Sequence, residues 1–239
     1  MESPLGLRLQ RDDMSLRKLA ENTLRDAILY GAFTPGQKLI ERDLCDRLGV
    51  SRTLLREALK QLEAEGLITN VVHKGPSVAV ITEEDAREIY EARGLIEGHL
   101  AYCFTLKASD AEIDKLAASV RTLHESDIAS NQINVLQAKN GFYEVLLAGS
   151  GNHVLAQMLQ QLNNRVTMLR RMTLSSPGRF DQTVAELDEI VQAVRSRDAD
   201  EASRLCRAHV KNAGDIALAS FSTPDAEGAP SGHSAVGAK

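Results

Sequence analysis

Apolar residues recur three and four positions apart from Ser15 to Tyr30, which is the spacing of one face of an amphipathic helix. Gly31 ends this pattern, and Thr34-Pro35-Gly36 has the composition of a tight turn. The pattern therefore predicts a helix that packs one side against a core.

Two shorter helices are expected next. The first is predicted over residues 41–48, because Gly49 can terminate a helix. The second is predicted over residues 52–65, because Ser51 is a favourable N-cap residue and Gly66 follows as a terminator.

A change of pattern follows these helices. Between Leu67 and Val80 the sequence contains β-branched runs on either side of the turn residues His73-Lys74-Gly75-Pro76, which predicts a two-stranded hairpin. Two short helices joined at Leu48-Gly49-Val50 and followed by a hairpin predict a winged helix-turn-helix.

The sequence from Thr82 to residue 222 has helical periodicity. Thr82 and Ser109 each stand three residues before an acidic side chain, as in a capping box. Short breaks divide the segment into predicted helices over residues 83–106, 109–129, 131–149, 152–174, 178–196 and 199–221. Six antiparallel helices with short connections predict a bundle.

The expected fold class is therefore mostly α. A winged helix-turn-helix domain over residues 15–81 is followed by an antiparallel six-helix bundle over residues 82–222. Residues 1–14 are polar without a period and are expected to form a flexible arm. Residues 223–239 are rich in Gly, Pro, Ser and Ala, so we expect a disordered tail.

Net charge at first gives no sign of a nucleic-acid partner, since it is −5 over 239 residues. The charge is unevenly spread, however. Residues 1–80 carry 12 Lys and Arg against 11 Asp and Glu, and the remainder carries 16 against 22. This asymmetry indicates two modules with different partners.

Other features bear on the compartment. No stretch is long and apolar enough for a membrane span, and the N-terminus lacks the apolar segment of a signal peptide. The three cysteines are isolated and fit a reducing environment. We therefore expect a cytoplasmic protein without a membrane partner.

The start of the second short helix offers side chains that can read DNA bases. Arg52 and Arg56 lie one turn apart on one face, and each can bind guanine O6 and N7, with roughly 1–3 kcal/mol of discrimination. Ser51 can cap the helix or bind a phosphate, which the free amide groups of the first turn attract, and Thr53 lies beside them. The alternative is a solvated charged face. The opposite stripe, expected to face the core, is Leu55, Ala58, Leu59 and Leu62.

Two further places can contact DNA. Arg42, at the start of the preceding helix, can reach the backbone or the same groove. Lys74 and Gly75, at the tip of the wing, can approach a phosphate or the minor groove, because glycine has no side chain.

The stretch AILYGAFTPGQKLIERDLCDRLGVSRTLLREALKQLEAEGLI resembles the DNA-binding domain of GntR-family transcriptional regulators. Their hallmark is Gly-x-x-x-Pro-Gly, then Val-Ser-Arg-Thr-Pro-Val-Arg-Glu-Ala-Leu and Leu-Glu-x-Glu-Gly-Leu. Here Leu54 and Leu55 replace the usual Pro-Val and leave both arginines in place. The resemblance, over about residues 16–80, implies DNA contacts by Arg42, Ser51, Arg52, Arg56 and Gly75. It also implies a homodimer on an inverted-repeat operator of double-stranded DNA.

The helical half resembles the effector domain of the FadR branch of this family, over about residues 83–222. The resemblance rests on Arg93-x-x-Ile96-Glu97, on Phe142 followed by Ser150-Gly151-Asn152, on Ile190-x-x-Ala193-Val194 and on His209. Six helices place it nearer the VanR-like subgroup.

Many members of this branch bind a divalent metal through one Asp and three His. The matching positions here are Lys139, Tyr143, Leu187 and His209. A charged ammonium group and a leucine cannot ligate, and one imidazole does not hold a metal alone. No metal or other cofactor is therefore expected.

Lys139 and Tyr143 lie four residues apart, on one helical face. A lysine in that place supplies the positive charge of the absent metal, so a small carboxylate effector can bind directly. Arg93 can hold a carboxylate with two hydrogen bonds, and His209, Tyr143 and Asn140 can add others. Two alternatives stay open, namely that Lys139 lies on the surface and that Arg93 pairs with a structural Glu97.

The sequence thus predicts a ligand-responsive transcriptional repressor, whose effector changes DNA affinity by binding one arrangement of the dimer better. One alternative is the same DNA-binding protein with a metal-dependent sensor. A second is an enzyme with a DNA anchor, against which stands the lack of GxSxG, phosphate-loop, HExxH and Cys-His motifs. A third is an architectural DNA protein, but residues 82–222 are more than dimerisation requires.

Overall fold

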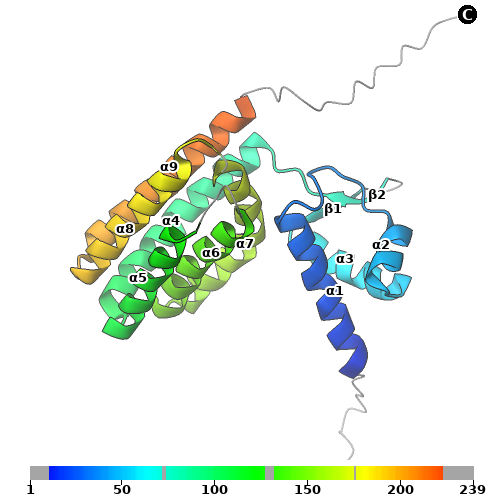
Figure 1. The fold of residues 1–239 in the computed structure, drawn as a ribbon, viewed down its shortest axis with the longest axis horizontal. Coiled ribbons are helices and arrows are strands. Elements are labelled where there is room, and N and C mark those ends of the chain that lie inside the picture. The colour runs from blue at the N-terminus through cyan, green and yellow to red at the C-terminus, as the bar shows by residue number, and fades with distance from the viewer. Residues whose placement is uncertain (1–10, 72–73, 127–131, 175, 223–239) are drawn as a thin grey trace, which may run out of the picture.

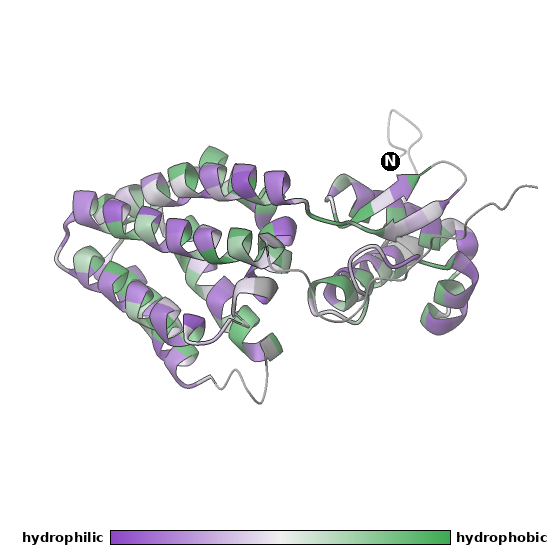
Figure 2. Cartoon of the chain, turned by 90° about the horizontal axis from the view of Figure 1, so that it is seen from above, coloured by the Kyte–Doolittle hydropathy of each residue, from purple (hydrophilic) through white to green (hydrophobic). Residues whose placement is uncertain are grey.

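The computed structural model describes residues 11–71, 74–126, 132–174 and 176–222. Figure 2 shows two lobes, with hydrophilic and hydrophobic residues alternating along the helices of each. The arm and tail expected at residues 1–10 and 223–239 lie outside the described residues. Among the helices described, none is both long and apolar enough to cross a membrane.

The N-terminal lobe is a winged helix-turn-helix, as predicted. Its elements are α1 (Arg11–Leu29), α2 (Glu41–Leu48), α3 (Arg52–Ala64), β1 (Ile68–Val71) and β2 (Gly75–Val78). The prediction was wrong at the start of α1, which begins at Arg11, so residues 11–14 belong to the helix rather than to the arm. Those four residues add a further turn before the apolar face begins.

The core of this lobe lies between α1, α3 and the hairpin. The stripe Leu55, Ala58, Leu59 and Leu62 is buried, as the spacing predicted. Leu24 and Ile28 of α1 pack in the same cluster. Burial of one apolar side of each helix therefore fixes α3 with its other side outward.

The hairpin has a third partner that the sequence pattern did not reveal. β1 and β2 are antiparallel, with Ile68 opposite Val78. The segment after the Thr34-Pro35-Gly36 turn lies on the other edge of β2. There Lys38 forms a bridge with Ser77, and the Leu39 amide donates to the Pro76 carbonyl at 2.9 Å. This pairing holds the wing against the start of α2.

The second lobe is the predicted bundle (Figure 1). Its helices are α4 (Glu83–Lys107), α5 (Asp110–His124), α6 (Gln132–Gly149), α7 (His153–Leu174), α8 (Arg179–Arg195) and α9 (Ala199–Ser222). Thr82 and Ser109 both form the predicted capping boxes, with Asp85 and Glu112. The mostly α fold is confirmed.

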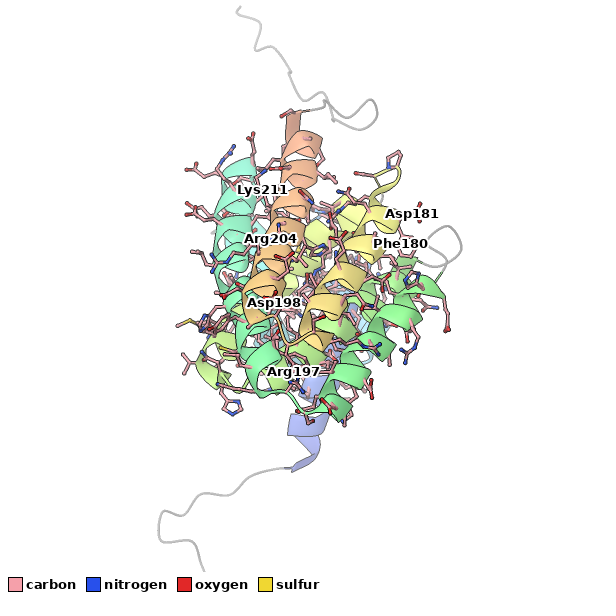
Figure 3. All side chains as sticks on the ribbon, turned by 90° about the vertical axis from the view of Figure 1, so that its left-hand side faces the viewer. Phe180, Asp181, Arg197, Asp198, Arg204 and Lys211 are labelled. Atoms are coloured by element: carbon pink, nitrogen blue, oxygen red, sulfur yellow. The ribbon has the colours of Figure 1, made fainter. Side chains whose placement is uncertain are left out.

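Helix α9 runs beside α4 and α8 (Figure 1), and a tight turn returns the chain from α8 to α9. Arg197 occupies that turn with a φ of 58°. Its guanidinium donates to the Ala108 carbonyl at 2.5 Å and to Asp110 at 2.7 Å, which closes the end of α4. Figure 3 shows Arg197 at this end of the bundle, with Arg204 and Lys211 farther along α9.

The two lobes touch through α7. Met168 is buried in the apolar cluster of the winged-helix lobe, with Leu24. Asn164 donates to the carboxylate of Glu65, at the end of α3, over 2.8 Å. The same carboxylate accepts two hydrogen bonds of 2.7 Å from Arg25 of α1. Helix α7 of the bundle is therefore hydrogen-bonded to the C-terminal end of α3.

Candidate DNA-binding face and effector site

The first turn of α3 is exposed and capped. Ser51 has extended backbone geometry, and its hydroxyl accepts a hydrogen bond of 3.3 Å from the Leu54 amide. Arg52 and Thr53 follow, both exposed. The predicted cap is confirmed, and α3 presents its N-terminal amides and side chains away from the core.

A single carboxylate organises the two arginines of α3. Arg56 donates to both oxygens of Glu41, each at 3.0 Å, and Arg52 lies 3.8 Å from the same carboxylate. The hydrogen bond with Glu41 raises the pKa of Arg56. Because both side chains are mostly exposed, Glu41 holds two guanidinium groups side by side at the surface.

The remaining predicted DNA residues lie around this pair. Arg42 is highly exposed at the start of α2. Lys74 is exposed at the wing, and Gly75 has a φ of +76° with open space where a Cβ would be. A groove of about 340 Å³ separates α3 from the wing, with Arg56 on one wall and Gly75 on the other. The fold thus brings both elements to one face.

Inside the bundle, Arg93 of α4 is completely buried. Its Nε donates to Glu97 over 2.6 Å, and its Nη2 lies 3.4 Å from the Tyr143 hydroxyl of α6. Burial disfavours the charged form, yet the nearby Glu97 carboxylate raises the pKa of Arg93. The Arg93–Glu97 ion pair left open by the sequence is therefore present, and it leaves Nη1 without a partner.

Lys139 of α6 is 1% exposed, so the alternative that places it on the surface is wrong. Burial lowers its pKa well below the usual range, and the cations Arg170, Arg93 and Arg179 lower it further. None of the ion pairs among the described residues includes Lys139. The core thus holds a lysine among arginines.

Arg170 of α7 completes this side of the cluster. It stacks on the Tyr143 ring, 4.1 Å from its centre, and donates to the Asn140 side chain over 2.6 Å. Burial lowers the pKa of Arg170 and raises that of Tyr143. Asn140 and Tyr143, both predicted site residues, therefore orient a third buried cation.

His209 of α9 belongs to a second group, built around Glu186 of α8. Its Nδ1 lies 2.5 Å from the Glu186 carboxylate, which Arg179 contacts at 2.9 Å. Burial lowers the pKa of His209 to about 4, and Lys139 adds to the effect. Burial alone would raise the pKa of Glu186, but hydrogen bonds from His209 and Arg179 hold it at about 2. At neutral pH the imidazole is therefore uncharged.

Several buried polar atoms of this cluster have no hydrogen-bond partner within the protein. Such atoms are costly unless a ligand or water satisfies them. They come from α4, α7, α8 and α9 and are Tyr90 Oη, Arg93 Nη1, Arg170 Nε, Arg179 Nε, Thr183 Oγ1 and His209 Nε2.

A cavity of about 510 Å³ between α6 and α7 reaches this cluster. Its inner wall includes Asn140, Tyr143 and Arg170, and its rim includes the exposed Glu144 and His153. Of the buried cations, Arg170 lines this cavity, whereas Arg93 and Lys139 are not among its lining residues.

The cluster does not fit a divalent metal. His209 keeps one nitrogen free, but the other positions supply the ammonium of Lys139, the phenol of Tyr143 and the side chain of Leu187. Leu187 is buried in the main apolar cluster. In the part of the chain that the structure describes, no three His, Cys, Asp or Glu side chains form a metal-binding group.

Sequence reasoning found part of this cluster and missed Arg170, Arg179, Thr183 and Glu186. Two signals were available. Arg170 interrupts the apolar stripe of α7, where a charged residue is rarely buried without a reason. Arg179 opens α8, although the helix dipole disfavours a cation in the first turn.

Two family models match the chain and divide it as the fold does. The model of bacterial regulatory proteins of the gntR family matches residues 16–78, and the FCD domain matches residues 88–212. The first match spans α1 to β2, and the second most of the bundle. Together with the winged helix, they define the class as a DNA-binding transcriptional regulator with an FCD domain.

Curated relatives agree with this class. The transcriptional repressor GlaR of Escherichia coli (strain K12) is 31% identical over 195 residues, 78% of this chain and 89% of that protein. The uncharacterized regulator YdhC of Bacillus subtilis (strain 168) is 27% identical over 192 residues, 79% and 84% of the two chains. This chain therefore belongs to the GntR family, in the subfamily that carries the FCD domain, whose members matched here are transcriptional regulators and not enzymes.

Solved structures share the fold. E. coli McbR/YncC aligns with a TM-score of 0.75 at 18% identity, covering 86% of this chain and 98% of that chain. A GntR transcriptional regulator from Rhodococcus sp. RHA1 aligns with a TM-score of 0.76 at 23% identity, covering 87% and 99%. At these identities the likeness supports the architecture alone.

Proposed function

We propose that this protein is a homodimeric, ligand-responsive repressor that acts in the cytoplasm on an inverted-repeat operator. A small anionic metabolite bound in the bundle changes its affinity for DNA. The observation that carries this proposal is the cluster of buried cations with unpartnered N–H groups, in a domain bonded to the end of the recognition helix. A repressor is favoured because two relatives, GlaR and the galactonate operon repressor of E. coli, are named as repressors.

On the DNA side, Arg52 and Arg56 read base edges in the major groove. Their guanidinium groups are exposed and already aligned by Glu41, so less side-chain freedom is lost on binding. Ser51, Thr53 and the amides of the first turn hold phosphates. From α2 and the wing, Arg42, Lys74 and Gly75 contact the flanking backbone.

On the effector side, the anion binds Arg93, Lys139, Tyr143, His209 and Asn140. Each is buried or half-buried around the same cluster, and Arg93 and His209 each hold a free nitrogen. A buried anion surrounded by such donors is bound strongly, because the site excludes competing water.

Helix α7 couples the two sites. One side carries Arg170 into the anion cluster, and another carries Asn164 and Met168 into the winged-helix lobe. An anion that draws Arg170 toward it shifts α7, and with it the contact to Glu65 at the end of α3. The effector then alters the separation of the two winged helices in the dimer, by as much as it prefers one arrangement.

DNA binding is tested by fluorescence anisotropy with labelled duplexes of inverted repeats from the protein's own promoter. Arg52→Ala and Arg56→Ala should each weaken binding by about 10- to 100-fold, from roughly 1–3 kcal/mol per base contact. Arg204→Ala, an exposed arginine on α9, is the control and should have no effect. Binding that is insensitive to salt, or equal in all variants, would contradict the proposal.

Effector binding is tested with a thermal-shift screen of small carboxylic acids, followed by anisotropy with the acids that stabilise the protein. Stabilisation by at least one acid, together with a change in operator affinity, is expected. Asn164→Ala should preserve both binding events and reduce the effect of one on the other. No stabilisation by any acid would favour a DNA-binding protein without an effector.

A further inference from the structure

The bundle core carries more positive than negative charge. Four cations are buried, namely Arg93, Lys139, Arg170 and Arg179, and each is at most 3% exposed. Against them stand two carboxylates, the buried Glu97 and the half-buried Glu186. Burial of unpaired charge is very unfavourable, so such an excess is relieved either by loss of the Lys139 proton or by a bound anion.

Other ionisable groups of the cluster do not supply that negative charge. Burial raises the pKa of Tyr143 and of Cys206, so both remain protonated at neutral pH. His209, with its pKa lowered to about 4, is neutral. The lowered pKa of Lys139 means that its ammonium form is disfavoured while no anion is present. When Lys139 and the three arginines are all charged, four positive charges face the two carboxylates.

The unpartnered donors fall into two groups. Arg93 Nη1 and Arg170 Nε belong to side chains that share Tyr143 as a neighbour, near Glu97. Arg179 Nε belongs to a side chain that contacts Glu186, and His209 contacts the same carboxylate. Because the neutral His209 ring donates its Nδ1–H to Glu186, its unpartnered Nε2 is an acceptor and is not counted among the donors.

Thr183 extends the second group. It lies one turn after Arg179 on α8, is completely buried and also has a free hydroxyl oxygen. Lys139 influences both groups, since Arg93, Arg170 and Arg179 all act on its pKa. The lysine itself is buried, one turn before Tyr143 on α6.

We propose that the effector carries two carboxylates, one held by Arg93 and Arg170 and the other by Arg179 and Thr183, with Lys139 as a further cation of the site. This inference rests on the proposed function and sharpens it. A monocarboxylate would satisfy one donor group and leave the other buried without partners. A dicarboxylate satisfies both groups and balances the charge of the core.

The test is titration calorimetry on the full chain at constant ionic strength. The probes are malonate, succinate, glutarate and adipate, each compared with the monocarboxylate of the same carbon number. At least one dicarboxylate should bind 100-fold or more tightly than its monocarboxylate partner. Inorganic phosphate is included as a compact anion and should bind more weakly than that dicarboxylate.

Two variants test the second group of donors. Thr183→Val removes an unpartnered hydroxyl without changing the side-chain shape, so folding is preserved while dicarboxylate affinity falls about 10-fold. Arg179→Gln should reduce the dicarboxylate to the affinity of the monocarboxylate. Thr105→Val is the matched control, because Thr105 is equally buried on α4 but donates to the Ala101 carbonyl. Its affinity should equal that of the wild type.

The outcomes separate this inference from the function on which it rests. Equal binding of paired mono- and dicarboxylates, or tighter binding of phosphate, overturns the two-carboxylate inference and leaves an anionic effector in place. Unchanged discrimination in both Thr183→Val and Arg179→Gln overturns the placement of the second carboxylate. If no acid binds at all, the proposed effector function itself is refuted.

Discussion

Replacing Glu65 with alanine removes the carboxylate at which α1, α3 and α7 meet. The wild-type side chain accepts two hydrogen bonds of 2.7 Å from Arg25, one of 2.8 Å from Asn164 and one of 3.1 Å from Gln61. Both Arg25 and Glu65 are less than one-fifth exposed. The substitution therefore leaves a partly buried guanidinium and an amide without their acceptor.

The expected cost is about 2 kcal/mol of unfolding free energy. A hydrogen bond to a charged group contributes roughly 1.5–3 kcal/mol, but bonds to one acceptor are not additive and partial exposure weakens them. Glu57→Ala is the matched control, on the same helix. Its ion pair with Lys60 spans 2.9 Å between two well-exposed side chains, so its removal should cause no measurable loss of stability.

Urea denaturation followed by far-ultraviolet circular dichroism measures both changes, since the chain has no tryptophan to report by fluorescence. A loss of this size lowers the midpoint by roughly 1 M. Glu65→Gln should fall between wild type and Glu65→Ala, because its amide oxygen can still accept from Asn164. If Glu65→Ala shifts the midpoint no more than Glu57→Ala, the lobes are not held together by this carboxylate.

Three further predictions concern the cap and the buried cluster. Ser51→Ala should lower the free energy of unfolding by about 1 kcal/mol, measured by thermal unfolding, because the helix cap is lost. Ser51→Asp should restore the cap and still weaken DNA binding, because its carboxylate repels phosphate. Equal DNA affinity of wild type and Ser51→Asp would contradict this. Because the pKa of His209 is about 4 when folded and about 6.5 when unfolded, the unfolded state binds the proton first, and stability falls as pH drops from 6.5 toward 4. Wild type should therefore lose about 2 kcal/mol more than His209→Gln between pH 8 and pH 5 in urea titrations, and equal losses would show that the imidazole is not held neutral. Lys139→Met should raise the melting temperature of the ligand-free protein and abolish carboxylate binding, because it removes a buried amino group whose charged form burial disfavours. A lower melting temperature would argue that Lys139 is structural.

Short-range patterns in the sequence predicted most of the fold. Helix periodicity, the capping boxes at Thr82 and Ser109 and the terminator Gly49 act within a few residues, so they can be read without tertiary information. The exposed face of α3 could also be predicted, because it lies opposite the apolar stripe through Leu55 and Leu62, which has to be buried. The early start of α1 was missed, because residues 11–14 carry no apolar periodicity.

The sequence predicted only part of the buried polar cluster in the bundle. Lys139, Tyr143 and His209 were placed together by resemblance, and Arg93 was added for its ability to bind a carboxylate. All four side chains are buried. Their actual partners, such as Arg170, come from helices whose relative rotation no local pattern records. Whether a charged side chain on a helix faces water or a core depends on that rotation.

The sequence by itself determined the order of the helices, the winged-helix topology and the exposed arginines of α3, because short-range spacing and capping fix these features. Only the tertiary structure decided that Lys139 is buried among three arginines and that α7 joins the anion cluster to Glu65. Both depend on contacts between residues far apart in the chain. Their energies come from burial and long-range pairing, and neither is encoded in any single segment.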